Sequence, residues 1–357
     1  MPQFAAAALS LLFLFHVSGI LQSLESASLH SSSLIDSFTR DVERISPDLD
    51  CWTSNGTWKF NPNITIVDNS TYYAPCKISF YGPKNPCSWV LDGDALKHEW
   101  ISNPICRSPT RRFSAPSFCS LLDGRNVLVV GDSISSHAFA SWVNLLLSRL
   151  GLSCSPESNP LKPGSHVQSS RIGRCGNVTM TFVRNDRLSL ATEAAPDADK
   201  QVFIETPWIN QLDNISVLIL NRGAHYENDT KVLSDLDATL THLRERHPGV
   251  RVLWRNTPHG HLDWKSHVGL HEKVLDKPPE LAPTHAFHYA LFRRQNEAVR
   301  AFLAARFPHV LYLDVFTMTV LRADNHFDAL HICAPGVADV WLEMIYNVLL
   351  LLHPSAS

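Results

Sequence analysis

The sequence lacks the surplus of positive charge that nucleic-acid-binding proteins usually carry. Its 31 Lys and Arg residues against 34 Asp and Glu residues leave a formal net charge of −3, and no basic stripe stands out along the chain. Collagen-like and coiled-coil repeats are absent, as is any series of long apolar runs. These absences argue against a nucleic-acid binder, a fibrous protein and a multi-span membrane protein.

The chain has enough apolar material for a large core. Its 357 residues are 45% hydrophobic and 18% charged, which is typical of a folded globular protein. This length suits two domains, or one large α/β domain with an added subdomain.

No two cysteines form a Cys-x-x-Cys pair, so zinc binding is a poor explanation for the 8 cysteines and disulfides are a better one.

Residues 1–28 contain an apolar run, Phe4–Phe15, interrupted only by Ser10, and we predict a signal peptide or an uncleaved signal anchor there. Six glycosylation sequons follow, at Asn55, Asn63, Asn69, Asn177, Asn214 and Asn228. Together these features predict a secretory-pathway protein, in the Golgi lumen or secreted, that contacts a membrane only through such an anchor.

The pattern of the chain changes near residue 120. Residues 29–119 are predicted to form a Cys- and Trp-rich subdomain, with disulfides and tryptophan packing in place of regular periodicity. In residues 120–353, apolar strand patterns alternate with helical ones, which predicts an α/β domain whose parallel sheet is covered on both faces. The expected strands are 125–130, 178–183, 216–220, 250–254 and 310–314, and the expected helices are 138–150, 230–246, 285–306 and 336–351.

Gly131-Asp132-Ser133 follows the first of these strands and precedes a helix. Gly131 would allow a sharp backbone bend there. The helix start would offer N–H groups to an oxyanion that forms beside the Ser133 hydroxyl. The alternative is that Asp132 or Ser133 only caps the helix.

Asp328-Ala-Leu-His331 precedes the last predicted helix. A serine nucleophile needs a base, and the base needs a carboxylate that orients it. The three-residue separation would let Asp328 reach Nδ1 of His331 while Nε2 points outward. The alternative is a surface pair without a catalytic role. A strand-end Ser early in the domain and Asp-x-x-His before its last helix match the arrangement of SGNH-type hydrolases.

Five further residues are candidates for oxyanion or substrate binding, each with a structural role as the alternative. Asn221, Gly223 or Gly173 could donate a hydrogen bond to an oxyanion. Arg255 and His259 could hold a substrate or order their loop.

A metal-dependent hydrolase is the rival that the histidines suggest, through His259, His261, His267, His271, His285 or His288. His267 and His271 have the spacing of one helical face, but no Glu follows His267 as a His-Glu-x-x-His motif requires. We therefore predict no metal ligands and no cofactor.

A resemblance covers residues 51 to 347. The block Gly124–His137 resembles the Gly-Asp-Ser block of the PC-esterase group, which includes the plant trichome-birefringence-like polysaccharide O-acetyltransferases. Other blocks resemble that family in the same order: Cys51 with Gly56-Thr-Trp58, Trp100 with Cys106, Asn221–His225, Trp254–His259 and Asp328–Trp341. The chain departs from the family pattern at Asn144, Ala329 and Ile332.

The resemblance implies a three-layer α/β/α fold of the SGNH-hydrolase type and catalysis by Ser133, His331 and Asp328. It implies acetyl transfer from a donor substrate to a glycan or polysaccharide hydroxyl, with a secreted carbohydrate acetyl esterase as the alternative. A catalytically dead glycan-binding or cell-wall protein is the alternative of another class. The resemblance also suggests a Cys51–Cys106 disulfide, and Cys154–Cys175 is a second candidate pair.

Overall fold

The computed structural model describes residues 31–64, 94–152, 166–176, 178–193, 203–225, 227–261, 288–326 and 328–353. The predicted leader, residues 1–28, lies outside these ranges. Among the described residues, no helix has the length and apolar character needed to cross a bilayer.

The centre of the fold is a six-stranded sheet with the strand order β4-β5-β3-β6-β7-β8. Five of its strands run parallel, and the edge strand β4 runs antiparallel to β5. The five predicted strands are confirmed, whereas β4 was not predicted because its mostly polar sequence gives little strand signal. The bounds are β3 Asn126–Gly131, β4 Val167–Ile172, β5 Val178–Arg184, β6 Ile215–Leu220, β7 Arg251–Arg255 and β8 Leu311–Leu313.

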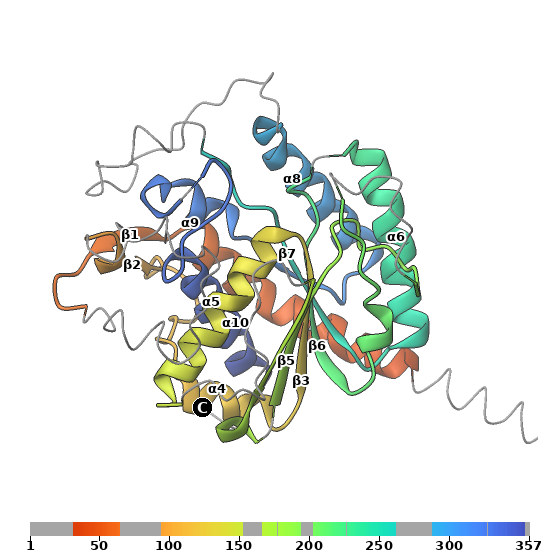
Figure 1. The fold of residues 1–357 in the computed structure, drawn as a ribbon, viewed down its shortest axis with the longest axis horizontal. Coiled ribbons are helices and arrows are strands. Elements are labelled where there is room, and N and C mark those ends of the chain that lie inside the picture. The colour runs from red at the N-terminus through yellow and green to blue at the C-terminus, as the bar shows by residue number, and fades with distance from the viewer. Residues whose placement is uncertain are drawn as a thin grey trace, which may run out of the picture.

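Helices cover both faces of this sheet, so the predicted three-layer α/β/α architecture is confirmed. Helices α4, α5 and α10 pack on one face, and α6 and α8 pack on the other (Figure 1). Each face buries its own hydrophobic cluster, as expected for a parallel sheet with helices on both faces. The bounds are α4 Ala115–Leu122, α5 Ser133–Arg149, α6 Asp229–Arg246, α8 Tyr289–Arg306, α9 Phe316–Val320 and α10 Val337–Leu352.

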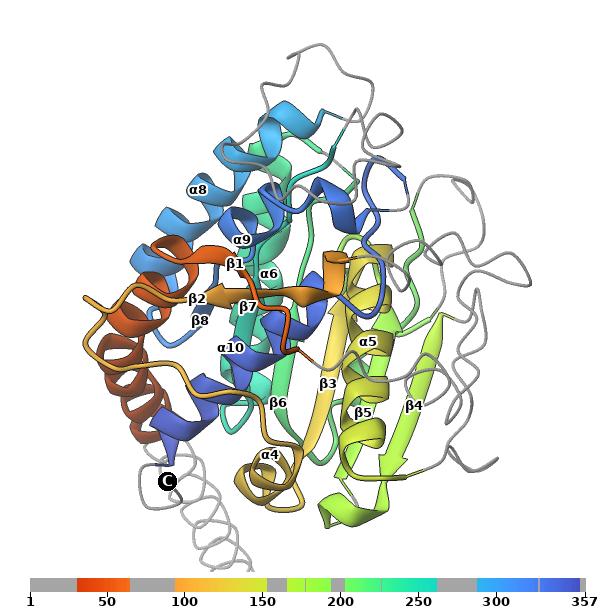
Figure 2. The ribbon, with the colours of Figure 1, turned by 90° about the vertical axis from the view of Figure 1, so that its left-hand side faces the viewer.

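The sheet brings distant segments of the chain to one edge. In Figure 2, which shows the sheet beside α5, β3 lies between β5 and β6. The carboxyl ends of parallel strands share one edge of a sheet. The segments that follow β3, β5, β6 and β7 therefore meet at a common edge.

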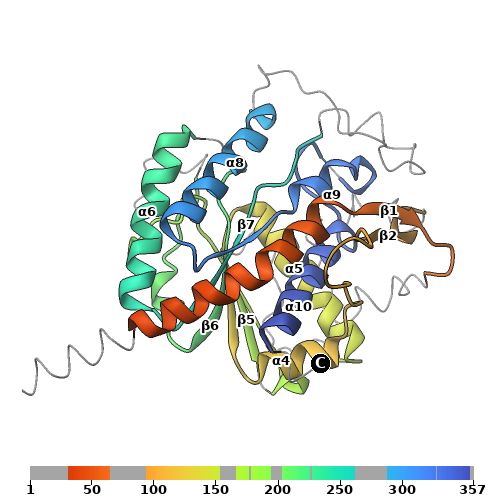
Figure 3. The same cartoon turned by 180° about the vertical axis from the view of Figure 1, so that it is seen from behind.

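The N-terminal part is more regular than its composition predicts. Residues 31–54 are helical, and this helix crosses the rear of the molecule (Figure 3). Strands β1 (Thr57–Phe60) and β2 (His98–Ile101) form a separate antiparallel pair. Ile45, Leu49 and Trp52 belong to the same hydrophobic cluster as α5 and α10. The N-terminal part therefore packs into the main core. The predicted boundary between residues 119 and 120 falls inside α4, and the division into two domains stays a prediction.

Two disulfides connect described cysteines. The predicted Cys51–Cys106 bond is present, with 5.6 Å between the Cα atoms. The predicted Cys154–Cys175 pairing is wrong, because Cys175 bonds to Cys119. Helix α4 packs against the turn after β4, which brings these two buried cysteines together. Cys333 is also disulfide-bonded.

Candidate active site

Ser133 is the first residue of α5, directly after the buried strand β3. Asp132 caps the helix, because one carboxylate oxygen accepts the N–H groups of Ile134 and Ser135 at 3.0 and 3.2 Å. Gly131 serves close packing and not an unusual backbone bend. A Cβ on Gly131 would lie 2.4 Å from Ser135 Oγ. The capping role of Asp132 therefore coexists with a hydroxyl placed at the helix start.

Ser133, His331 and Asp328 form one hydrogen-bonded series, although 198 residues separate the serine from the histidine. Ser133 Oγ lies 2.8 Å from His331 Nε2, and His331 Nδ1 lies 2.7 Å from Asp328 Oδ2. The carboxylate can only accept, so Nδ1 carries the proton and Nε2 accepts from the Ser133 hydroxyl. This geometry suits a serine nucleophile with a general base.

Asp328 is held as a carboxylate by donors on its own turn. Burial alone would raise the pKa of Asp328, but the His331 side chain and the backbone N–H groups of His331 and Leu330 lower it to about 2. Those N–H groups donate to Oδ1 at 2.6 and 2.8 Å, which leaves Oδ2 for the imidazole. The carboxylate is therefore fixed in orientation as well as in charge.

The loop that carries Asp328 and His331 is anchored at Asn325. The Asn325 carbonyl accepts the N–H of Cys333 at 2.7 Å, and its side-chain oxygen accepts the N–H of Val337 at 2.8 Å. Gly336 has a φ of 158°, and a Cβ there would lie 2.3 Å from the Asn325 amide. The start of α10 thus packs too closely against this loop to admit a side chain.

Arg255 lies beneath the turn of Ser133. Its guanidinium is 1% exposed and donates to Ser135 Oγ at 2.8 Å and to the Asn256 carbonyl at 2.9 Å. Burial lowers the pKa of Arg255 to about 10, while nearby Asp132 opposes this shift. Of the two roles considered for Arg255, these contacts favour ordering the turn.

Asn221 joins neighbouring strand ends. Its amide group donates to the Arg255 carbonyl at 2.9 Å, and its side-chain oxygen accepts from Ser135 at 3.4 Å. Gly223 packs against Thr257, where a Cβ would lie 2.1 Å from Oγ1. Both residues are at the carboxyl edge beside β3, and their oxyanion role stays a prediction.

The prediction that Gly173 binds an oxyanion is wrong. Gly173 follows β4, whose last residue pairs with Val178 at the start of β5. The end of β5 is the part that pairs with Gly131. Gly173 therefore lies beside the amino ends of the parallel strands, whereas Ser133 lies at their carboxyl ends. At about 3.3 Å per residue, this places it roughly 20 Å from the site. The position of Gly173 differs from the expected one because β4, which was not predicted, runs antiparallel to β5.

His259 belongs to a buried group of aromatic rings. Its ring centroid lies 5.2 Å from that of His261 and 5.3 Å from that of Phe316, and His261 lies 4.5 Å from His326. Burial, with His326 nearby, lowers the pKa of His259 to about 4. His259 is 5% exposed, which favours a role in ordering the loop over a role in contacting substrate.

Within the described part of the chain, no group of three or more His, Cys, Asp and Glu residues has an arrangement that could hold a metal ion. His267, His271 and His285, which belong to the metal alternative, lie outside the described residues.

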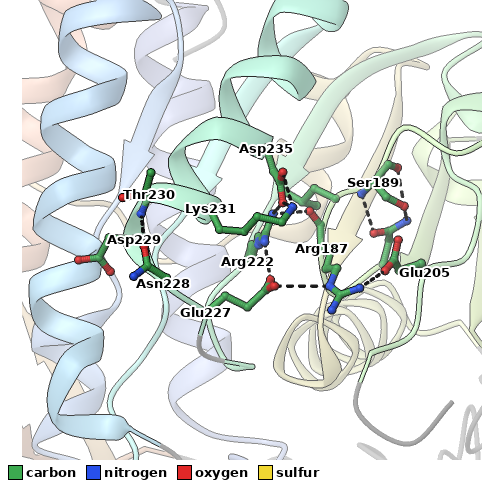
Figure 4. Close-up of polar contacts among 12 residues, drawn as sticks. Arg187, Ser189, Glu205, Arg222, Glu227, Asn228, Asp229, Thr230, Lys231 and Asp235 are labelled. Atoms are coloured by element: carbon green, nitrogen blue, oxygen red, sulfur yellow. Dashed lines mark hydrogen bonds and ion pairs between the residues drawn. The ribbon is translucent and has the colours of Figure 1, made fainter. Parts of the chain in front are cut away.

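A network of ion pairs holds the segments that follow β5 and β6 (Figure 4). Buried Arg222 donates to Glu227 and, at 2.7 Å, to Asp235 of α6. Arg187 pairs with Glu205 at 2.9 Å. Arg187 also pairs with Glu227 at 3.6 Å, so this network links the segment after β5 to the segment after β6.

Sequence reasoning missed two residues that contact this machinery. Ser135 links Arg255 to Asn221, and the His137 ring stacks on His331 at a centroid distance of 5.0 Å. The spacing from Ser133 to His137 is four residues, which places both on one helical face. That spacing was the available signal for His137.

Comparison with known proteins gives a distant relationship. No family model matches the chain. The chain is 21% identical over 376 residues to Protein trichome birefringence-like 4 of Arabidopsis thaliana, and the match covers 90% of this chain and 78% of that protein. This similarity agrees with the resemblance seen in the motifs.

Among solved structures, the chain is similar to the periplasmic domain of a Salmonella Paratyphi A lipopolysaccharide acetyltransferase. The TM-score is 0.40 at 11% identity, over 75% of this chain and 98% of that one. It is also similar to a family two carbohydrate esterase of Clostridium thermocellum. There the TM-score is 0.33 at 11% identity, over 72% of this chain and 67% of that one.

Proposed function

We propose that this chain transfers an acetyl group to a glycan hydroxyl through an acetyl-serine intermediate on Ser133. The observation that carries the proposal is the hydrogen-bonded series from Ser133 Oγ through His331 to Asp328. An arrangement of this kind activates a serine hydroxyl that is otherwise a weak nucleophile.

In the first half-reaction, Ser133 Oγ attacks the acetyl carbonyl carbon of the donor, and its proton passes to His331 Nε2. Asp328 stays ionised and stabilises the imidazolium that forms. The backbone N–H of Ser133, at the positive end of α5, with Asn221 or Gly223, would stabilise the oxyanion. The tetrahedral intermediate then collapses, and the donor's leaving group takes the proton from His331.

In the second half-reaction, a glycan hydroxyl gives its proton to His331 Nε2 and attacks the acetyl carbonyl of Ser133. The new ester forms as the bond to Ser133 Oγ breaks, and Ser133 recovers its proton from His331. The serine and the imidazole are restored, and the two steps consume only the acetyl donor and the glycan hydroxyl.

Hydrolysis of the same intermediate is the second candidate. The side chains of His331 and Asp328 are 25% and 40% exposed, which gives water a route to the base. The resemblance to the trichome-birefringence-like family favours transfer, because that family includes polysaccharide O-acetyltransferases. A glycan-binding protein without catalysis is disfavoured by the complete hydrogen-bonded series.

Purified protein incubated with an activated acetyl ester, with and without oligosaccharide acceptors, tests this proposal. We expect acetylated oligosaccharide, at the expense of free acetate, and loss of both products in Ser133→Ala. Acetate release that no glycan alters would refute the transferase and leave the esterase. Ser133→Ala activity equal to wild type would refute both.

We further propose a lumenal or secreted location. The Cys51–Cys106 and Cys119–Cys175 disulfides support it, because such bonds persist in oxidising compartments. Digestion with an endoglycosidase, followed by gel mobility, tests it: unchanged mobility of protein from a eukaryotic host would contradict this location.

A further inference from the structure

His137 lies one helical turn after Ser133, on the same face of α5. Its ring stacks on the imidazole of His331, with 5.0 Å between centroids and 26° between the ring planes. His137 Nδ1 lies 3.5 Å from the carbonyl oxygen of Ile332, the residue after His331. Helix α5 therefore supplies both the Ser133 hydroxyl and a ring that contacts His331, the general base.

The hydrogen bond from His331 Nδ1 to Asp328 holds one point of the imidazole and does not by itself set the plane of the ring. The χ2 torsion of a histidine has a broad energy minimum, so small joint changes of χ1 and χ2 can tilt the ring while the Nδ1 hydrogen bond is kept. Such a swing would move Nε2 away from Ser133 Oγ. A flat ring packed on the face of the imidazole opposes this motion.

His137 also suits its place electrostatically. The charged or titratable groups that face it are His331 and Asp328 from their loop and Arg184 from the end of β5. Burial, together with His331, lowers the pKa of His137 to about 3. His137 is therefore neutral near pH 7 and places no positive charge beside the imidazolium that forms on His331.

We propose that His137 is a positioning residue for acyl transfer, which holds the plane of the His331 imidazole so that Nε2 points at Ser133 Oγ. This inference rests on the proposed function. It assigns the effect to the stacked face of the His137 ring, and replacement by Phe removes the Nδ1 contact with Ile332 while keeping that face.

The test compares His137→Phe, which keeps a flat ring, with His137→Ala and His137→Gln, which do not. A misplaced base costs roughly 10- to 100-fold in rate, so kcat for acetyl release should fall by about that factor in the Ala and Gln variants. KM should stay near the wild-type value, because the proposal gives His137 no contact with the substrate. The Phe variant should recover most of kcat.

His309→Ala is a matched control. His309 is also buried and neutral near pH 7. It precedes β8, so it lies at the amino ends of the parallel strands, away from Ser133. Its removal should lower the melting temperature without changing kcat. If a general loss of packing were the cause, kcat would fall in the control as it does in the His137 variants.

The outcomes separate this inference from the proposed function. If kcat of His137→Ala or His137→Gln equals that of wild type, or if His137→Phe is as slow as these two, the inference is overturned. Should the Ala variant fail to fold, the comparison of Gln with Phe still decides. Activity retained by Ser133→Ala would instead overturn the proposed function itself.

Discussion

Replacing Asp328 by Asn tests the orientation of the catalytic base by changing a single atom. The backbone N–H groups of Leu330 and His331 both donate to Asp328 Oδ1. In the variant, the amide oxygen should keep these two donors, so the amide nitrogen would face His331 Nδ1. That nitrogen can only donate, and Nδ1 would have to accept.

The consequence is the wrong tautomer of His331. With Nδ1 unprotonated, the neutral imidazole carries its proton on Nε2, 2.8 Å from Ser133 Oγ, and cannot remove the proton of the hydroxyl. The same change in a serine protease triad lowers kcat by about 10⁴-fold, which is about 5 kcal/mol of activation free energy. We expect a loss of that order here.

The assay is steady-state release of acetate from an activated ester, with the melting temperature as a check on folding. Asp237→Asn, the same change at an ion pair on the distant helix α6, should leave kcat unchanged. The reasoning is refuted if folded Asp328→Asn protein keeps more than a tenth of the wild-type kcat.

Three further predictions concern stability and the turn beside the nucleophile. Gly131→Ala should cost about 1 to 3 kcal/mol in the free energy of unfolding and lower kcat, because its Cβ would meet Ser135 Oγ at 2.4 Å; unchanged urea unfolding and activity would contradict this. Replacing Cys51 and Cys106 by Ser opens a disulfide that spans 55 residues and should cost about 4 kcal/mol by chain entropy, measured by urea unfolding; a loss below about 1 kcal/mol would contradict it. Burial lowers the pKa of His326 from 6.5 to about 4, so the unfolded chain binds the proton more readily and stability falls as the pH drops from 6.5 towards 4. Between pH 7 and pH 5, wild type should therefore lose about 2 kcal/mol more than His326→Gln, and equal losses in urea titrations would contradict this.

Much of the fold could be predicted because parallel strands buried on both faces leave a clear apolar signal. Residues 125–130 and 250–254 were identified in this way and form β3 and β7. Strand β4 lies at an edge, and its alternating, mostly polar sequence gives no such signal. The helix over residues 31–54 was also not predicted, and long-range packing of Trp52 against the core, invisible in a local pattern, helps to hold it.

At the site, too, features set by neighbouring residues could be predicted, and features set by long-range contacts could not. The spacing of Asp328 and His331, and the place of Ser133 after a strand, were readable because each depends on a few neighbouring residues. The error at Gly173 and the pairing of Cys175 both follow from the antiparallel strand β4, which reverses the chain direction before that turn. The stacking of His137 on His331 joins segments 194 residues apart, and only the three-dimensional structure brings them together.

The most direct measurement is the mass of the peptide that contains Ser133 after acid quenching of the enzyme with its acetyl donor. The account predicts one acetyl group on Ser133 in the wild type, its removal when a glycan acceptor is added before the quench, and none in Ser133→Ala. Acetylated glycan produced while Ser133 stays unmodified at every time point, or produced equally well by Ser133→Ala, would contradict it.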